Sequence, residues 1–163
     1  MRNFIKENRM RQQKGFTLME ILLVIGLLAV LAVVVFVALD PAKRFQDTRN
    51  ARRTTDIQNI LSAVHTYVND TKGTFPAAIT STEKQIGTAT TGCAISGAGG
   101  CNVTGATDCI DLSTALGSYL KSIPVDPNGT AALTGYSIVK DTNNMVTVRA
   151  CNAEGGVTVM TSR

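Results

Sequence analysis

The sequence predicts an α+β fold in which a long N-terminal α-helix packs under a small antiparallel C-terminal β-sheet that is cross-linked by disulfides. Three observations predict it: a long apolar run near the N-terminus, an amphipathic helical stripe after it, and three alternating segments at the end. The 163 residues accordingly divide into a leader at 1–15, an apolar helix at 16–40, its amphipathic continuation at 41–72, and a globular head at 73–163.

The leader carries the whole net charge of the chain. The formal charge is +4, and residues 1–15 hold five basic residues against one acidic residue. From Phe16 onward, eleven basic residues balance eleven acidic ones. Proteins that coat nucleic acid keep their positive charge on the folded surface. The charge distribution therefore argues against that class of protein.

The apolar helix is long enough to cross a membrane. Residues 21–39 contain no polar side chain, and these 19 residues span about 28 Å as a helix. This length matches a bilayer core of roughly 30 Å and exceeds the core of a signal peptide. Pro41 removes a backbone donor and crowds the carbonyl of Val37, so we expect a kink or unwound turn at 37–41.

An amphipathic helix follows over residues 45–70. Its apolar side chains recur with helical spacing and form one stripe, which consists of Ile57, Ile60, Leu61, Val64 and Val68. The first half is polar all round, so it should contact water or charged neighbours. Gly73 and Pro76 are expected to end the helix.

The head should be a loop region followed by a small sheet. Residues 77–107 are mostly Gly, Ala, Ser and Thr, which predicts loop. A short helix is expected from Asp111 to Leu120 and a β-turn at 126–129. The segments 136–140, 145–151 and 157–160 alternate as strands of an antiparallel meander. We expect this sheet to cover the stripe of the amphipathic helix.

Four cysteines point to disulfides. Their spacing does not suit zinc, and the chain has one histidine, His65. Disulfides imply an oxidising space outside the cytoplasm, which sets the N-terminus inside and the head outside. Basic residues flank both ends of the apolar run, so the positive-inside rule does not decide the orientation. Three pairings are possible; we expect Cys93–Cys101 across a Gly-rich turn, with Cys109–Cys151.

The junction between leader and apolar helix combines a glycine with an isolated acid. Gly15 lies where a protease could bind extended backbone with little steric hindrance. Glu20 lies inside the apolar run, where a charge at the bilayer centre costs about 2.5–3.5 kcal/mol. A cut after Gly15 would free the amine of Phe16, four residues from Glu20 on one helix face. The alternative is that Glu20 merely reaches the lipid headgroups.

The segment KGFTLMEILLVIGLLAVLAVV resembles the N-terminal signature of type IV pilins and of type II secretion pseudopilins. The resemblance implies cleavage by a prepilin peptidase between Gly15 and Phe16, methylation of Phe16, and a role for Glu20 in adding subunits to a filament. The resemblance continues through TYVNDTKGTFP, and YLKSIPVDPNG is similar to a segment of major pseudopilins. The resemblance fades across residues 79–110. Many pilins carry a helix-bending proline near Val37, whereas here it is Pro41.

The resemblance implies a non-enzymatic structural subunit of a type IV pilus-type filament. The alternatives are a major pseudopilin of a type II secretion system and a DNA-uptake pilin. Its partners would be further copies of itself, the prepilin peptidase, an inner-membrane assembly platform and the lipid bilayer. The chain would span the inner membrane once, with its N-terminus in the cytoplasm, before it enters an extracellular or periplasmic filament.

Three other readings are weaker. An enzyme would need an acid–base or nucleophilic motif, and His65 beside the apolar stripe is better read as structural. Nucleic acid is a less favoured partner, because Asp47 and Asp56 flank the basic cluster of Arg49, Arg52 and Arg53. No cofactor is expected; calcium, which some major pseudopilins bind, is the less favoured alternative, because the spacing of its candidate ligands does not fit a twelve-residue calcium loop. Those candidates are Asp126, Asn128, Asp141, Asn143, Asn144 and Glu154.

Overall fold

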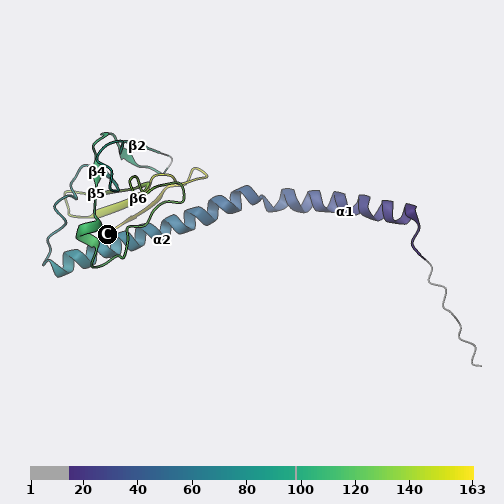
Figure 1. The fold of residues 1–163 in the computed structure, drawn as a ribbon, viewed down its shortest axis with the longest axis horizontal. Helices are drawn as coiled ribbons and strands as arrows, with labels where there is room; N and C mark the ends of the chain where they lie inside the picture. Colours follow the sequence, from purple (N-terminus) through teal and green to yellow (C-terminus); the bar gives the residue numbers. More distant parts are fainter. Residues whose placement is uncertain (1–14, 98) are drawn as a thin grey trace, which may run out of the picture. The chain divides into compact units, whose positions relative to one another are not determined.

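A computed structural model describes residues 15–97 and 99–163 of the chain (Figure 1). The chain forms two compact units, one ending at Pro41 and the other running from Ala42 to Arg163. The expected basic leader, apart from Gly15, lies outside the described residues.

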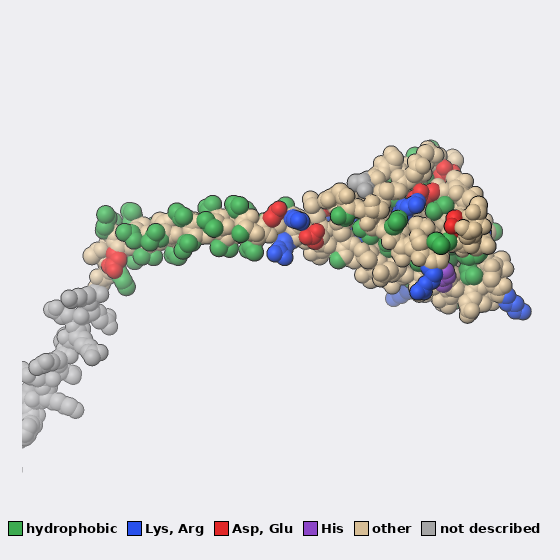
Figure 2. All heavy atoms as spheres, turned by 180° about the vertical axis from the view of Figure 1, so that it is seen from behind, with side chains coloured by type: hydrophobic (Ala, Val, Ile, Leu, Met, Phe, Trp, Pro, Cys, Tyr) green, Lys and Arg blue, Asp and Glu red, His purple; other side chains and the backbone are tan. Residues whose placement is uncertain are grey.

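The first unit contains helix α1, Leu18–Leu39. Thr17 caps its N-terminus, since its hydroxyl oxygen accepts a hydrogen bond of 3.2 Å from the backbone N–H of Glu20. None of its residues is buried, and Figure 2 shows hydrophobic side chains along its length. The described residues contain one helical segment that is long and apolar enough to cross a membrane, and it begins at Leu18.

A single residue separates α1 from the next helix. Asp40 has a φ of 36°, the left-handed conformation, and helix α2 begins at Pro41. The residue before a proline disfavours the helical conformation, whereas proline itself suits the first helical position. A kink or an unwound turn is expected within residues 37–41, and the helix is interrupted inside that range. The structure keeps Val37 to Leu39 helical and confines the interruption to Asp40.

Helix α2, Pro41–Asp70, carries the predicted apolar stripe. Its side chains at 57, 60, 61 and 64 are buried in the core, and Val68 packs against the same core while partly exposed. The helix ends where Lys72 and Gly73 take positive φ values and the Gly73 N–H donates to the carbonyl of Val68. This arrangement satisfies carbonyls at the helix end.

The main sheet has the strand order β4-β1-β5-β6-β7. The strands are β1 Lys84–Ile86, β4 Cys109–Ile110, β5 Tyr136–Lys140, β6 Val146–Ala150 and β7 Val159–Ser162. The antiparallel meander of the last three strands is confirmed, with Ile138 opposite Val148 and Val148 opposite Thr161. Its last strand covers 159–162 instead of the expected 157–160. The sheet is not wholly antiparallel, because β1 and β4 run parallel.

The expectation of loop throughout residues 77–107 is wrong in part. Strand β1 pairs with both β4 and β5, and its Ile86 is wholly buried. A second, two-stranded sheet joins β2, Ile95–Ser96, to β3, Asn102–Val103. These strands are two or three residues long, so no alternating pattern reveals them in the sequence.

Helix α3 and the turn after it lie where the sequence predicts a helix and a turn. Helix α3 covers Ser113–Leu116 and is shorter than the expected helix from Asp111 to Leu120. The Asp111 carboxylate accepts a 2.8 Å hydrogen bond from the Ser113 N–H. The β-turn at 126–129 is confirmed by the bond from the Gly129 N–H to the Asp126 carbonyl.

The core of the second unit lies between α2 and the inner face of the sheet, as Figure 1 shows. Alternate residues of β5 and β6 face the helix stripe: Tyr136, Ile138, Val146, Val148 and Ala150. Burial of each large apolar side chain is worth about 1.5–3 kcal/mol. The amphipathic helix therefore supplies the support that the small sheet requires.

Candidate functional site

The segment before α1 is open and non-helical. Residues 15–17 have no regular structure, and the Phe16 side chain is 77% exposed. No atom would lie within 4 Å of a Cβ placed on Gly15. Nothing in the described residues crowds Gly15, so a requirement for glycine would come from a protein that binds this segment. The bond between Gly15 and Phe16 is accessible to such a protein.

Glu20 lies in the first turn of α1. Its backbone N–H is capped by Thr17, and its exposed carboxylate forms no hydrogen bond or ion pair with any described residue. Negative charge at a helix N-terminus is favourable, which offsets part of the cost of an acid in an apolar segment. Glu20 is thus available to a cation from outside the described residues.

Helix α1 also has small residues at regular intervals. Gly26, Ala29 and Ala32 are all exposed, and no atom would lie within 4 Å of a Cβ on Gly26. Small residues allow helices to approach closely in membranes. The surrounding side chains are large and apolar, so α1 offers an exposed apolar surface interrupted by these three small residues.

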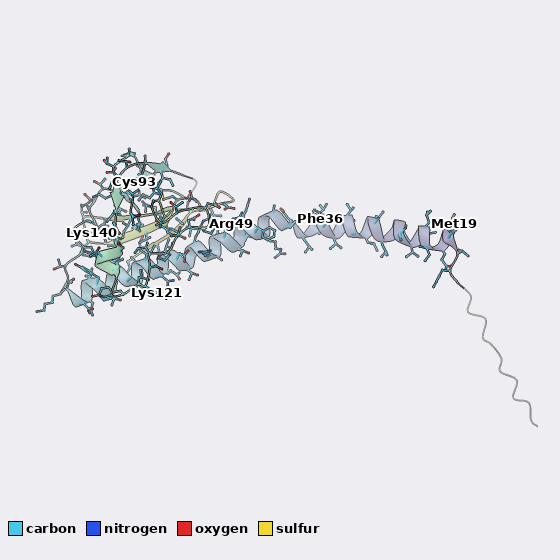
Figure 3. All side chains as sticks on the ribbon, viewed as in Figure 1. Met19, Phe36, Arg49, Cys93, Lys121 and Lys140 are labelled. Atoms are coloured by element: carbon cyan, nitrogen blue, oxygen red, sulfur yellow. A yellow bond between two sulfur atoms is a disulfide. The ribbon has the colours of Figure 1, made fainter. Side chains whose placement is uncertain are left out.

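An ion-pair cluster joins α2 to the head. The wholly buried Arg53 guanidinium donates to both carboxylate oxygens of Asp126 at 2.5 and 3.1 Å, and to Glu154 at 3.2 Å. Arg49 donates to the two oxygens of Glu154 at 2.8 and 2.5 Å, near the head as Figure 3 shows. Bidentate, charge-assisted hydrogen bonds of this kind fix the orientation of the two side chains and also stabilise the contact. We call these four residues the arginine clamp.

The clamp shifts the pKa values of its members. The hydrogen bond from Arg49 lowers the pKa of Glu154 to about 2, with a further contribution from Arg53. The hydrogen bond to Asp126 raises the pKa of Arg53. The carboxylate of Glu154 is therefore held in its charged form by the two arginines beside it.

The proposed calcium ligands separate into two groups. Asp126, Asn128 and Glu154 come together, but the arginines of the clamp neutralise both carboxylates. Asp141, Asn143 and Asn144 lie in the β5–β6 turn, where the Asp141 carboxylate accepts bonds from backbone N–H groups. Within residues 15–97 and 99–163, no group of three His, Cys, Asp or Glu side chains could hold a metal ion.

The basic cluster of α2 is largely used inside the fold. Arg53 is buried and Arg49 is bound to Glu154. Arg52 is the exposed member, and it lies 3.7 Å from Asp56. A phosphate-binding patch requires solvent-facing cations. This arrangement gives no support to a nucleic-acid surface at these three arginines.

All four cysteines form disulfides, but the expected pairing is wrong. Cys93 pairs with Cys109, and Cys101 pairs with Cys151. The Cys93 N–H donates a 3.0 Å hydrogen bond to the Ala106 carbonyl, which places Cys93 beside the segment that leads to Cys109. The pairing of β1 with β4 places Cys109 at the edge of the main sheet.

The disulfides and a polar cluster hold the loops against the sheet. Figure 3 shows Cys93 in the loops on the side of the sheet away from α2. Beneath the loops, the Ser137 hydroxyl donates to Glu83 at 2.6 Å and lies 3.1 Å from the Cys101 sulfur. Arg149 donates to the same Glu83 carboxylate at 2.8 Å. The sequence contained no local signal for this cluster, because strand β1 places Glu83 there.

His65 lies on α2, one residue after the buried Val64. It is partly buried, and its Nε2 atom is buried without a hydrogen-bond partner. Tyr136, which the sequence analysis did not single out, donates a 2.7 Å hydrogen bond to Asp56 and is wholly buried. Burial, followed by this bond, raises the pKa of Tyr136. It is a structural link between α2 and β5.

One comparison with known proteins gives a match. The protein-family model "Prokaryotic N-terminal methylation motif" matches residues 10–36, which include Gly15, Phe16 and Glu20. This motif is typical of type IV pilins and pseudopilins. No curated protein and no solved structure matches the chain.

Proposed function

We propose that this chain, a pilin-like structural protein with a prokaryotic N-terminal methylation motif, is the major subunit of a type IV pilus-type filament. The observation that carries the proposal is helix α1. Its 22 residues are apolar except for Glu20, none of them is buried, and the methylation motif extends into it. Such a surface needs either lipid or other subunits to cover it.

Processing would occur at the open segment before α1. A prepilin peptidase binds residues around Gly15 in extended form and cuts the bond to Phe16. The new amine of Phe16 then receives a methyl group. The exposure of Phe16 and the absence of crowding at Gly15 support access at this bond.

Glu20 would then guide the addition of subunits. After the cut, the amine of Phe16 lies four residues from Glu20 and can pair with it in the same chain or in a neighbouring one. An unpaired charge in lipid is costly, so pairing between neighbours favours the docked state. The carboxylate of Glu20 has no partner among the described residues, which supports this role.

Extraction from the inner membrane would exchange lipid for protein contacts. The apolar side chains of α1 become buried again against α1 helices of other subunits, and Gly26, Ala29 and Ala32 allow close approach. The arginine clamp holds the head on α2 throughout, because Arg53 and Asp126 are wholly buried. The filament would have α1 in its core and the disulfide-bonded heads outside.

A major pseudopilin of a type II secretion system is the second candidate. The segment from Tyr119 to Gly129 resembles that of major pseudopilins, and it contains Asp126 of the clamp. A surface pilus would be recovered by shearing cells, whereas a pseudopilus would stay in the periplasm. A DNA-uptake pilin gains no support, since two arginines of the basic cluster lie in the clamp.

The proposal is tested with Glu20→Ala expressed in the native cells. The variant should be processed normally, with loss of residues 1–15 and one added methyl by intact mass, and should stay in the membrane. Its filament yield should fall to near background. Thr17→Ala is the matched control, because it removes the cap of α1 but keeps the carboxylate. Normal filaments from Glu20→Ala, or a mature chain that retains Met1, would contradict the proposal.

A further inference from the structure

The β-turn at residues 126–129 ends in the one Asn-Gly pair of the sequence, Asn128 and Gly129. Asparagine before glycine is the pair most prone to deamidation, because glycine has no side chain to hinder attack by its own backbone nitrogen. Asn128 is exposed, so water reaches its side-chain amide. The pair is therefore a candidate site of spontaneous covalent modification.

Deamidation would replace the Asn128 amide with a carboxylate in successive steps. The Gly129 nitrogen loses its proton and attacks the Cγ atom of Asn128. The new C–N bond closes a succinimide ring, and Nδ2 leaves as ammonia after taking up a proton. Water then opens the ring. Attack of water at Cγ leaves aspartate, whereas attack at the main-chain carbonyl carbon leaves isoaspartate, in which the chain runs through Cγ.

The fold restrains both reacting groups of this pair. The Gly129 N–H donates a 2.8 Å hydrogen bond to the Asp126 carbonyl, so its proton is held. A Cβ on Gly129 would lie 2.5 Å from the Thr134 carbonyl oxygen, which shows how closely the glycine is packed. The side-chain amide of Asn128 donates to Glu154 at 3.4 Å. Attack by the Gly129 nitrogen therefore requires a local opening of the turn.

The arginine clamp keeps this turn closed. The Asp126 carboxylate accepts the Asn128 N–H at 2.8 Å, is wholly buried, and receives two bonds from Arg53. If Arg53 withdraws, an uncompensated charge is left in the interior, and moving the carboxylate into water lowers its free energy. Asp126 is the first residue of the turn, so its movement would also release the Gly129 N–H.

We propose that Asn128 is a deamidation site and that the arginine clamp controls its rate. While the clamp is closed, the amide persists. When the clamp opens, Asn128 converts to aspartate or isoaspartate. The new carboxylate lies where the amide donates to Glu154, and repulsion between like charges there opposes closure of the clamp. Modified chains therefore accumulate with the time that the clamp spends open.

Ageing of the purified full chain in detergent tests this control. The chain is incubated at mildly alkaline pH, and peptide mass spectrometry follows the conversion of Asn128. Folded wild type should convert at least roughly tenfold more slowly than wild type unfolded in urea. Arg53→Met should convert at least roughly tenfold faster than folded wild type. Arg52→Met, the matched control, should stay within about twofold of wild type.

A double variant separates control by the buried charge from a general loss of the fold. Arg53→Met combined with Asp126→Asn leaves no unpaired charge. The new asparagine precedes Pro127, which has no N–H and cannot attack it. The double variant should convert Asn128 at a rate within about threefold of wild type. Folded wild type as fast as unfolded chain, Arg53→Met as slow as wild type, or a double variant as fast as Arg53→Met would each overturn the proposal.

Asn128→Asp tests the effect of the product on the clamp. It should lower the urea concentration at the midpoint of unfolding relative to Asn128→Ser, an uncharged control that also suits a turn. Equal midpoints would overturn the repulsion between the product and Glu154. These measurements use the purified chain and need no filament, so their failure would leave the proposed function intact.

Discussion

Removal of the Arg53 side chain tests the arginine clamp. In Arg53→Met, the Asp126 carboxylate loses both of its guanidinium bonds while its side chain remains wholly buried. It keeps the hydrogen bond from the Asn128 N–H, which does not neutralise the charge. Removing one partner of a buried ion pair costs about 3–5 kcal/mol of unfolding free energy. We expect Arg53→Met to lower the unfolding free energy by an amount in that range.

The neighbouring arginine provides a matched control. The side chain of Arg52 is 62% exposed, and its distance to Asp56 is 3.7 Å. Exposed pairs of this kind contribute about 0.2–1 kcal/mol. Arg52→Met removes the same charge one residue away, so it should lower the unfolding free energy by about 1 kcal/mol or less.

Urea unfolding of the full chain in detergent measures both variants. Urea is uncharged and does not screen ion pairs, and the unfolding free energy is obtained by linear extrapolation. The chain has no tryptophan, so the near-UV circular dichroism of its tyrosines reports on the second unit. Those tyrosines are Tyr67, Tyr119 and Tyr136.

A double variant separates the buried charge from other effects of the substitution. Arg53→Met combined with Asp126→Asn leaves no unpaired charge, so it should be more stable than Arg53→Met alone. Equal losses from Arg53→Met and Arg52→Met would refute the reasoning that burial makes this pair important. A double variant that is less stable than Arg53→Met alone would also refute this reasoning.

Three further outcomes are expected. Gly15→Val should block cleavage, because the branched side chain hinders binding of the extended backbone by the peptidase. Precursor of full mass should then accumulate in the membrane. Normal processing of this variant would contradict recognition of Gly15 by the peptidase. The pKa of Glu154 falls from 4.5 to about 2 on folding, so its contribution is lost as the pH falls through that window. Thermal melts should show the stability difference between wild type and Glu154→Gln shrinking from pH 4.5 to 2, and a constant difference would refute the assignment. Non-reducing peptide mapping should join Cys93 to Cys109, whereas a Cys93–Cys101 bridge would contradict the pairing in the structure.

The helices and the meander could be predicted because their signals are local. The apolar run of α1 and the spacing of Ile57, Ile60 and Val64 follow from helical periodicity alone. The alternation of Tyr136 to Lys140 marks β5, whose bounds agree with the expected strand. The methylation motif is likewise contiguous, so Gly15, Phe16 and Glu20 could be singled out without a structure.

The disulfide pairing could not be predicted from spacing. It depends on strands β1 to β4, which are two or three residues long and gain their stability from partners distant in sequence. Cys101 reaches Cys151 across 50 residues because the loops fold back over the end of β6. Short strands have no periodicity of their own, so their register is a property of the assembled sheet.

Contiguous patterns are sufficient to predict the apolar helix, the proposed processing site and the helical support for the sheet, since each depends on residues a few positions apart. The arginine clamp could not be predicted from a contiguous pattern. Arg53 and Asp126 are 73 residues apart, and the sequence shows them as one member of a basic cluster and one candidate calcium ligand. The packing of α2 against the head removes both from water, and the cost of burying either charge alone makes them partners.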